Sequence, residues 1–142
     1  MLGRCVTTTL TIPESHRDLL DTSTAVLGTV GPDGRPQLSA VWFVADGDDL
    51  KVSLNTTRQK TKNLRANPAV NLFVLDPQNP QRYLEVRGDA DVADDPDRAF
   101  AAGPVSEKYG VDVRTFDGPG AERVVVTVRP TRINAVDMSG GA

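Results

Sequence analysis

Five basic residues and no acidic residue lie in the segment from Leu50 to Leu75. This segment therefore carries a charge of +5, in a chain of 142 residues whose net charge is −3. The basic residues are Lys51, Arg58, Lys60, Lys62 and Arg65. Flexible cations, threonine hydroxyls and the N–H groups at a helix start are together the donors that bind a phosphate group. The segment predicts a site for a phosphate or a similar anion.

Four of the five cations lie on or beside a helix that the sequence predicts over residues 57–66. Thr56 is expected to cap this helix, and Asn67-Pro68 ends it, because the residue before a proline avoids helical backbone angles. Cations close to a helix N-terminus are unfavourable, since that end of the helix is already positive. A solvated basic helix face is the alternative interpretation, and charge alone leaves both open.

The overall composition excludes several classes of partner and site. The net charge of −3 and the lack of aromatic residues among the cations argue against a nucleic-acid partner. With one cysteine, Cys5, and one histidine, His16, neither an internal disulfide nor a multi-histidine metal site is expected. No apolar run approaches the ~20 residues of a membrane span, and the first residues lack a signal-peptide pattern. A single cytoplasmic domain over residues 1–142 is therefore expected, with no metal and no membrane partner.

Alternating and β-branched residues predict a chain made mainly of strands. Strands are expected at residues 25–30, 37–45, 50–55, 69–75, 81–92, 123–129 and 131–137. Short helices are expected at residues 13–21, 57–66 and 96–109, the last with a break at Gly103-Pro104. The first three strands follow one another through turns with no helix between them, which excludes a parallel doubly wound sheet. The pattern indicates an antiparallel β-barrel of six or seven strands.

The expected strand at residues 37–45 places successive side chains on opposite faces of the sheet. Gln37 and Ser39 share one face, and Trp42 lies on the other. If the face with Ser39 looks at a ligand, Trp42 is expected in the core or in a dimer interface, where large aromatic side chains are usually found.

Three motifs resemble those of the pyridoxamine 5′-phosphate oxidase-like split-barrel family. The first is Gly-Arg-Pro-Gln-Leu-Ser at residues 34–39, the second spans residues 55–64, and the third is Asn67-Pro68. Within the second motif, the form Arg-x-Lys-x-x-Asn-Leu resembles the branch of the family that uses the deazaflavin coenzyme F420. The segments Asp-Pro-Gln-Asn-Pro at 76–80 and Tyr-Leu-Glu-Val-Arg-Gly at 83–88 share this resemblance. It extends over residues 25–92.

The resemblance implies an FMN-binding-like antiparallel split β-barrel, mainly β with short helices. It also implies a homodimer with two cofactor sites at its interface. In the family pattern, Arg58 and Lys60 hold the phosphate of the cofactor. Asn55, Thr56 and Asn63 support this end of the site.

At the ring end of the cofactor, the resemblance implies that Gln37 and Ser39 lie along the isoalloxazine-like ring. Gln81 of the partner subunit and Tyr83 of the partner subunit would close the ring pocket. No side chain is assigned a catalytic role, because the cofactor itself carries the hydride chemistry.

Three functions remain open on the sequence. The first is an F420-dependent oxidoreductase that transfers a hydride between F420 and a small conjugated or heteroaromatic substrate. The second is an oxidase or reductase of the same fold that binds FMN and is yellow when purified. The third is a carrier or sensor that binds F420 or a flavin without turnover, which the shortage of acid–base residues allows.

Overall fold

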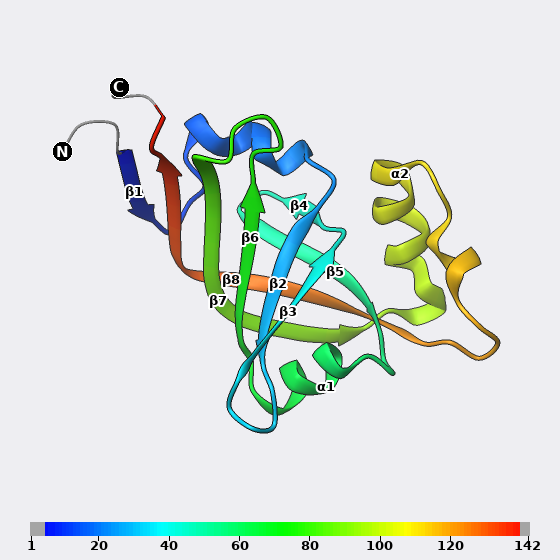
Figure 1. Cartoon of the computed structure of the whole chain (residues 1–142). Coiled ribbons are helices and arrows are strands. Elements are labelled where there is room, and N and C mark those ends of the chain that lie inside the picture. The colour runs from blue at the N-terminus through cyan, green and yellow to red at the C-terminus, as the bar shows by residue number, and fades with distance from the viewer. Residues whose placement is uncertain (1–4, 140–142) are drawn as a thin grey trace.

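Two long, strongly curved strands, β7 and β8, run through the molecule (Figure 1). The computed structural model describes residues 5–139. Across these residues one antiparallel sheet has the strand order β3-β2-β6-β7-β8-β5-β4, and β1 pairs with β8. The strands are β1 (Cys5–Thr9), β2 (Ala25–Val30), β3 (Pro36–Val41), β4 (Val44–Asp46), β5 (Asp49–Asn55), β6 (Ala69–Leu75), β7 (Arg82–Asp94) and β8 (Arg123–Asp137). The prediction of a mainly β, antiparallel barrel is confirmed.

The pairing of β7 with β8 runs along the whole of β7, and both strands bend in the middle (Figure 1). The register shifts between Arg87 and Gly88, where Pro130 faces Gly88. A Cβ atom at Gly88 would lie 2.1 Å from the backbone oxygen of Arg129. Only glycine allows this close approach, and a proline is tolerated at such an irregularity because the strand hydrogen bonds are already interrupted there.

Alternate residues of the strands fill the core of the barrel. In β5, Leu50, Val52 and Leu54 are buried while Lys51 and Ser53 are partly exposed, as the alternation predicts. The same period of two recurs in β2 and β6. The sheet therefore buries one face along these strands and leaves the other available for a site.

The strand count differs from the expected six or seven for three reasons. The predicted strands at 123–129 and 131–137 are one strand, because β8 continues through Pro130. The predicted strand at 37–45 is divided into β3 and β4, since the chain leaves the sheet at Trp42 and Phe43. The sequence analysis did not predict β1 at all. The described residues consequently form eight strands.

The helix that carries the cations, α1 (Gln59–Ala66), begins later than predicted. Thr56 does not cap it: the N-cap residue is Arg58, which makes no side-chain cap. The cause is a turn in which the Oδ1 atom of Asn55 accepts hydrogen bonds from the backbone N–H and the hydroxyl of Thr57. This turn keeps the chain out of the helix until Gln59. The helix predicted at residues 13–21 forms as a 3₁₀ helix, η1 (Glu14–Asp21).

Residues 96–121, between β7 and β8, form a small lobe beside the barrel, which we call the 96–121 lobe (Figure 1). Its elements are the 3₁₀ turn η2 (Pro96–Arg98), the π-helical turn η3 (Ala101–Val105), α2 (Ser106–Tyr109) and the 3₁₀ turn η4 (Val113–Phe116). A separate apolar cluster of Ala101, Val105 and Val113 holds the lobe together. The lobe therefore has a small apolar cluster of its own, against which Val44 of β4 also packs.

The predicted break at Gly103-Pro104 does not occur. The chain stays helical from Ala101 to Tyr109, first as a π turn and then as α2. The wider π turn accommodates Pro104. The carbonyl of Ala101 accepts a hydrogen bond from the hydroxyl of Ser106, 2.7 Å away. Among the described residues, no helix has the length and apolarity that crossing a bilayer demands.

Candidate functional site

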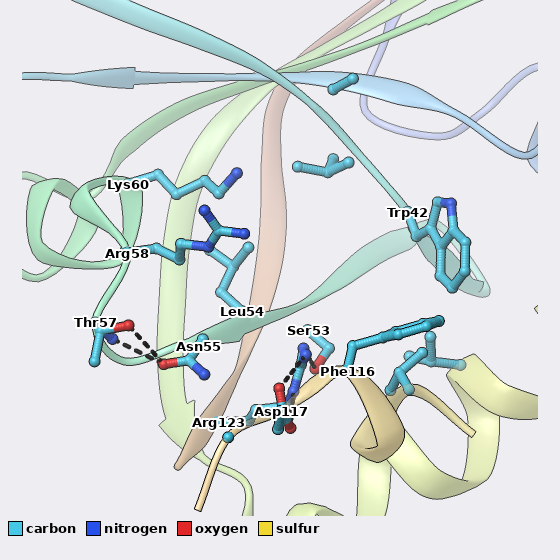
Figure 2. A pocket seen from close by; sticks show the side chains of 15 residues that line it. Trp42, Ser53, Leu54, Asn55, Thr57, Arg58, Lys60, Phe116, Asp117 and Arg123 are labelled. Atoms are coloured by element: carbon cyan, nitrogen blue, oxygen red, sulfur yellow. Dashed lines mark hydrogen bonds and ion pairs between the residues drawn. The ribbon is translucent and has the colours of Figure 1, made fainter. Parts of the chain in front are cut away.

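A cleft of about 500 Å³ lies between the start of α1, the strands β3 and β5, and the 96–121 lobe (Figure 2). Its floor includes Val41 from β3 and Leu54 from β5. One end carries cations from the start of α1, and the opposite wall carries aromatic residues from the β3–β4 connection and the lobe. A volume of this size is within the range of small-molecule and cofactor sites.

Arg58 and Lys60 form the cationic end, and both side chains extend into the cleft (Figure 2). The Nζ atom of Lys60 donates a hydrogen bond to the Oγ atom of Ser39, at 3.0 Å. Within residues 5–139, the side chain of Arg58 has no hydrogen-bonded or ion-paired partner. Partial burial and the nearby Arg58 charge lower the pKa of Lys60. Two cations without an acidic partner thus face the same space, which favours an anionic ligand.

Asn55 and Thr57 lie beside these cations and also line the cleft. Their side chains are bonded to each other, which fixes the backbone between β5 and α1. Thr56 does not line the cleft, and its backbone N–H donates to the carbonyl of Glu122, 3.0 Å away. The predicted contacts of Asn55 and Thr56 with a cofactor stay predictions.

Asn63 is buried behind the cleft rather than in its wall. Its Nδ2 atom donates to the Oγ1 atom of Thr29 at 3.0 Å and to the Oε1 atom of Gln37 at 2.9 Å. Its Oδ1 atom accepts from Gln59. Asn63 therefore joins α1 to β2 and β3, and so positions the helix whose first turn bears Lys60. Direct contact of Gln37 or Asn63 with a cofactor is untested.

Gln81 and Tyr83 lie outside the cleft of their own chain. Gln81 directly precedes β7, and Tyr83 is the second residue of that strand. The ring of Tyr83 packs against Phe73 of β6, with ring centroids 4.9 Å apart. The expectation that they close the site from a partner subunit stays a prediction.

Trp42 was expected in the core or in an interface, and the core assignment is wrong. Its side chain is 39% exposed and lines the cleft. The physical reason is that the strand is interrupted: the backbone N–H of Phe43 donates to the hydroxyl of Tyr109, and the Phe43 carbonyl accepts from Lys108. Residue 42 therefore lies outside a strand, and the alternation of side chains between the two sheet faces does not predict its direction. Trp42 instead stacks on the ring of Tyr109, at 4.1 Å between centroids and 5° between planes.

The side chains of Lys108 and Tyr109 attach the lobe to the barrel. The Nζ atom of Lys108 donates to the carbonyls of Leu20 and Phe43 and lies 3.8 Å from the centre of the Phe43 ring. The hydroxyl of Tyr109 donates to the carbonyl of Ser23, 2.8 Å away. Burial lowers the pKa of Lys108 and raises that of Tyr109. These contacts hold α2 against the barrel, and with it the ring of Tyr109 on which Trp42 stacks.

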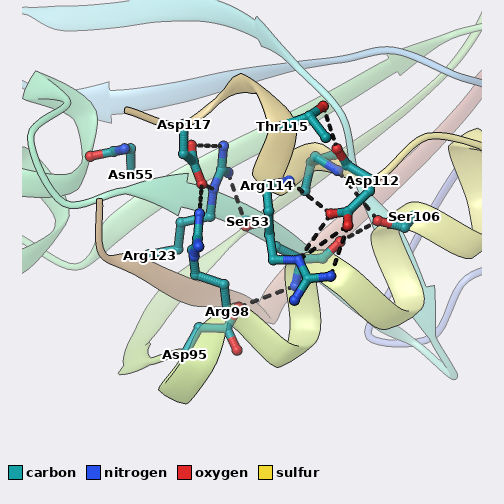
Figure 3. Close-up of polar contacts among 12 residues, drawn as sticks. Ser53, Asn55, Asp95, Arg98, Ser106, Asp112, Arg114, Thr115, Asp117 and Arg123 are labelled. Atoms are coloured by element: carbon teal, nitrogen blue, oxygen red, sulfur yellow. Dashed lines mark hydrogen bonds and ion pairs between the residues drawn. The ribbon is translucent and has the colours of Figure 1, made fainter. Parts of the chain in front are cut away.

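A buried carboxylate, Asp117, lies between the guanidinium groups of Arg98 and Arg123 and lines the cleft (Figure 3). Both oxygens of Asp117 accept from Arg123, at 2.8 Å each, and one also accepts from Arg98 at 3.1 Å. The side chain of Asp117 is 3% exposed. Hydrogen bonds from Arg123, more than any other contact, lower the pKa of Asp117. The carboxylate therefore remains ionised and fixes the two guanidinium groups.

The cleft residues that sequence reasoning did not assign to a site include Trp42, Phe116, Asp117 and Arg123. The chain offered only a weak signal for them, an aromatic residue and an acid directly before Gly118-Pro119-Gly120. Their convergence depends on the fold of the 96–121 lobe, which local patterns do not specify.

Solved structures with the same fold include relatives of this chain. An F420 reductase is 43% identical, with a TM-score of 0.76, over 86% of this chain and 98% of that chain. The conserved Mycobacterium tuberculosis protein Rv2991 is 25% identical, with a TM-score of 0.73, over 91% of this chain and 87% of that one. General Stress Protein 26 from Bacillus anthracis, at 21% identity and a TM-score of 0.64, covers 84% of this chain and 89% of its own length, and shares the fold.

A match to the pyridoxamine 5′-phosphate oxidase family covers residues 12–137, which include the whole barrel from β2 to β8 and the entire cleft. The curled antiparallel sheet and the cationic helix start agree with this match. The chain belongs to the pyridoxamine 5′-phosphate oxidase family.

Proposed function

We propose that the protein is an F420-dependent oxidoreductase that transfers a hydride between coenzyme F420 and a small conjugated or heteroaromatic substrate. The observation that carries the proposal is the pair Arg58 and Lys60, two cations that face one end of a ligand-sized cleft. Similarity at 43% identity to an F420 reductase supports F420 as the cofactor.

The residues present fit this cofactor. Arg58 and Lys60 would hold its phosphate, with Asn55 and Thr56 at the same end. A phosphate gains charge-assisted hydrogen bonds there that are roughly twice as strong as those between neutral groups. Ser39 of β3, which already accepts from Lys60, would lie along the ring of the cofactor.

When bound, the deazaflavin would supply or accept the hydride. The protein binds and orients both reactants. Two titratable side chains of the described cleft differ in their contacts. Asp117 is ion-paired with Arg98 and Arg123, whereas Lys60 is only partly buried and can contact a ligand. Asn63 and Gln37 hold α1 against β3, and so fix the position of the helix start whose side chains would donate hydrogen bonds to the phosphate.

A homodimer belongs to the same proposal. β3 is an edge strand of the described sheet, and its Leu38 is 69% exposed. Exposed apolar side chains on a sheet edge favour association with another chain. The partner's Gln81 and the partner's Tyr83 would then reach the ring end of the cofactor. Light scattering of the purified protein should give twice the mass of the chain.

The decisive experiment is a fluorescence titration of the purified protein with F420 and with FMN, side by side. We expect F420 to bind more tightly than FMN, and K60A and R58A to weaken F420 binding at least tenfold. The matched control is K62A, which removes a cation from an exposed position of α1 that does not line the cleft. Affinity for F420 that is the same in K60A, R58A and K62A would refute the assignment.

Turnover is measured separately, as oxidation of reduced F420 by a panel of conjugated acceptors. A protein that binds F420 tightly and oxidises it with none of them would be a carrier or sensor. Preferential binding of FMN would instead identify a flavoprotein of the same fold.

A further inference from the structure

We propose that the lobe end of the cleft binds the substrate and selects a planar conjugated acid, with its ring against Trp42 and Phe116 and its carboxylate on Arg123. This inference rests on the proposed function, which assigns the start of α1 to the cofactor phosphate. Arg123 pairs with Asn55 across β5 and β8, so the proposed carboxylate site adjoins the phosphate site. The inference adds a substrate class and the residues that recognise it.

The aromatic wall is the first observation. The side chain of Phe116 is 67% exposed, although it lies in a packed lobe. Its ring stands at 70° to that of Trp42, with centroids 6.5 Å apart. Tyr109 covers one face of Trp42, so the exposed part of the indole faces the cleft. A flat ligand ring can stack on one of these rings and meet the edge of the other, the two arrangements that aromatic pairs prefer.

The Trp42 side of the wall is held in place, which makes it suited to selecting a planar shape. Trp42 is held by the stack with Tyr109, whose hydroxyl is bonded to the backbone of Phe43 and Ser23. Because these contacts are made before a ligand arrives, little conformational entropy is lost when a planar molecule binds.

The charge at this end is the second observation. Arg123 donates to both oxygens of Asp117 and, through Nη1, to the Oγ atom of Ser53 at 3.2 Å. A guanidinium has five N–H groups, so two of them lack a protein acceptor among the described residues. Arg98 binds the same carboxylate, and the group of two guanidiniums and one carboxylate keeps a net charge of +1.

Arg123 lines the cleft, whereas Arg98 lies behind it. The side chain of Arg123 is 14% exposed, so it is fixed in place but reachable from the cleft. Its remaining N–H groups and its uncompensated charge fit a carboxylate. The aromatic wall is close to this cation, because Asp117, which is bonded to Arg123, directly follows Phe116 in the chain. A ring and a carboxylate on one small molecule match the two features together.

The test uses the full chain without cofactor and two probes of the same shape, 4-nitrocinnamate and its neutral amide, 4-nitrocinnamamide. Calorimetry measures affinity. The fluorescence intensity of Trp42, the one tryptophan of the chain, corrected for absorption by the probe, reports contact with the nitroaromatic ring. We expect the carboxylate to bind about tenfold more tightly than the amide, and both probes to quench the emission at saturation. Equal affinities, or unquenched emission from the saturated protein, would overturn the proposal.

Two matched pairs of variants assign the contacts. R123Q should abolish the preference for the carboxylate, while R98Q, which removes the other partner of Asp117 and the same charge, should retain most of it. F116A should weaken both probes about fivefold, while V111A, at an exposed position of the lobe outside the cleft, should weaken neither. If R58A rather than R123Q removed the preference, the carboxylate would lie at the cationic end and the proposal would fail.

A last comparison separates this inference from the proposed function. Saturating F420 should leave the probe bound, because the probe is assigned to Trp42, Phe116 and Arg123, while the cofactor phosphate is assigned to Arg58 and Lys60. Competition between them would refute the substrate site while leaving the cofactor assignment intact. Failure of F420 itself to bind would refute the cofactor assignment, whatever the probes show.

Discussion

The Nζ atom of Lys60 donates a hydrogen bond to the Oγ atom of Ser39, 3.0 Å away, and so connects α1 to β3. This contact turns the lysine toward the cleft instead of into bulk water. Burial at this position, together with the charge of Arg58, lowers the pKa of Lys60. The ammonium form that an anion requires is therefore lost at a lower pH than for an ordinary lysine.

We predict a pH dependence of cofactor binding from this lowered pKa. The affinity should be constant at lower pH, where Lys60 is charged, and should fall about tenfold as the pH rises through its pKa. K60R should keep its affinity over the same range, because an arginine stays protonated. Titrations of both proteins across the alkaline range test this, and ionisation of the ligand affects both equally. Parallel curves for the two proteins would contradict the prediction.

Asn63 is predicted to stabilise the fold through its contacts with Thr29, Gln37 and Gln59. In N63A these three side chains lose a partner, and two of the lost bonds come from a buried donor. We expect the free energy of unfolding to fall by about 2 kcal/mol, measured by chemical denaturation. N71A, at an exposed position of β6, should stay within about 0.5 kcal/mol of the parent protein. A loss confined to cofactor affinity would instead identify Asn63 as a binding residue.

Asp117 is predicted to contribute stability that is lost in acid. Because its pKa is lowered in the folded protein, its contribution is fully present above the ordinary aspartate pKa and declines as the pH falls through the lowered value. D117N leaves the cations of Arg98 and Arg123 without their carboxylate, which should cost about 3 kcal/mol near neutral pH.

Denaturation at several pH values checks this prediction. The difference between the parent protein and D117N should shrink as the pH is lowered below 4, roughly the range in which carboxylates titrate. D112N is the matched control, since Asp112 pairs with Arg114 on the same lobe but at the surface, and it should lose much less. A pH-independent difference would argue that the asparagine disrupts packing rather than charge.

Gly88 is predicted to be irreplaceable in the bent strand pair. The Cβ atom of G88A would lie 2.1 Å from the oxygen and 2.8 Å from the carbonyl carbon of Arg129, and backbone cannot move aside as a flexible side chain does. We expect a loss of about 3 kcal/mol or failure to fold. G103A is the control, because no atom beyond the neighbouring backbone of its own helix lies within 4 Å of the added group, and its stability should be unchanged or slightly raised. Thermal denaturation of both variants decides between these outcomes.

The strands that the sequence predicts with correct bounds are those whose signals are local. β2 and β6 are runs of apolar and β-branched residues between turn-forming or proline-containing segments, and both have the predicted limits. The cationic end of the cleft was predictable for the same reason, since Arg58 and Lys60 lie within one short segment.

The aromatic and acidic residues of the cleft were not predictable in this way. Trp42 faces the cleft because Lys108 and Tyr109, far along the chain, bind the backbone of Phe43 and interrupt the strand. Arg123, which binds Asp117, meets Ser53 only once β8 has paired with β5. Periodicity describes neighbours in sequence, and these contacts depend on the tertiary fold.

The position of β8 also has a consequence for biosynthesis. This one strand pairs with β1, β5 and β7, so it joins three segments that leave the ribosome earlier. Until residues 123–137 emerge, β5 and β7 keep unpaired edges, and the nascent chain exposes much of its apolar interior. Closure of the sheet therefore waits for residues 123–137 and requires contacts between distant segments, which slows folding. During that interval, chaperones that recognise exposed strands have their best opportunity to bind this polypeptide.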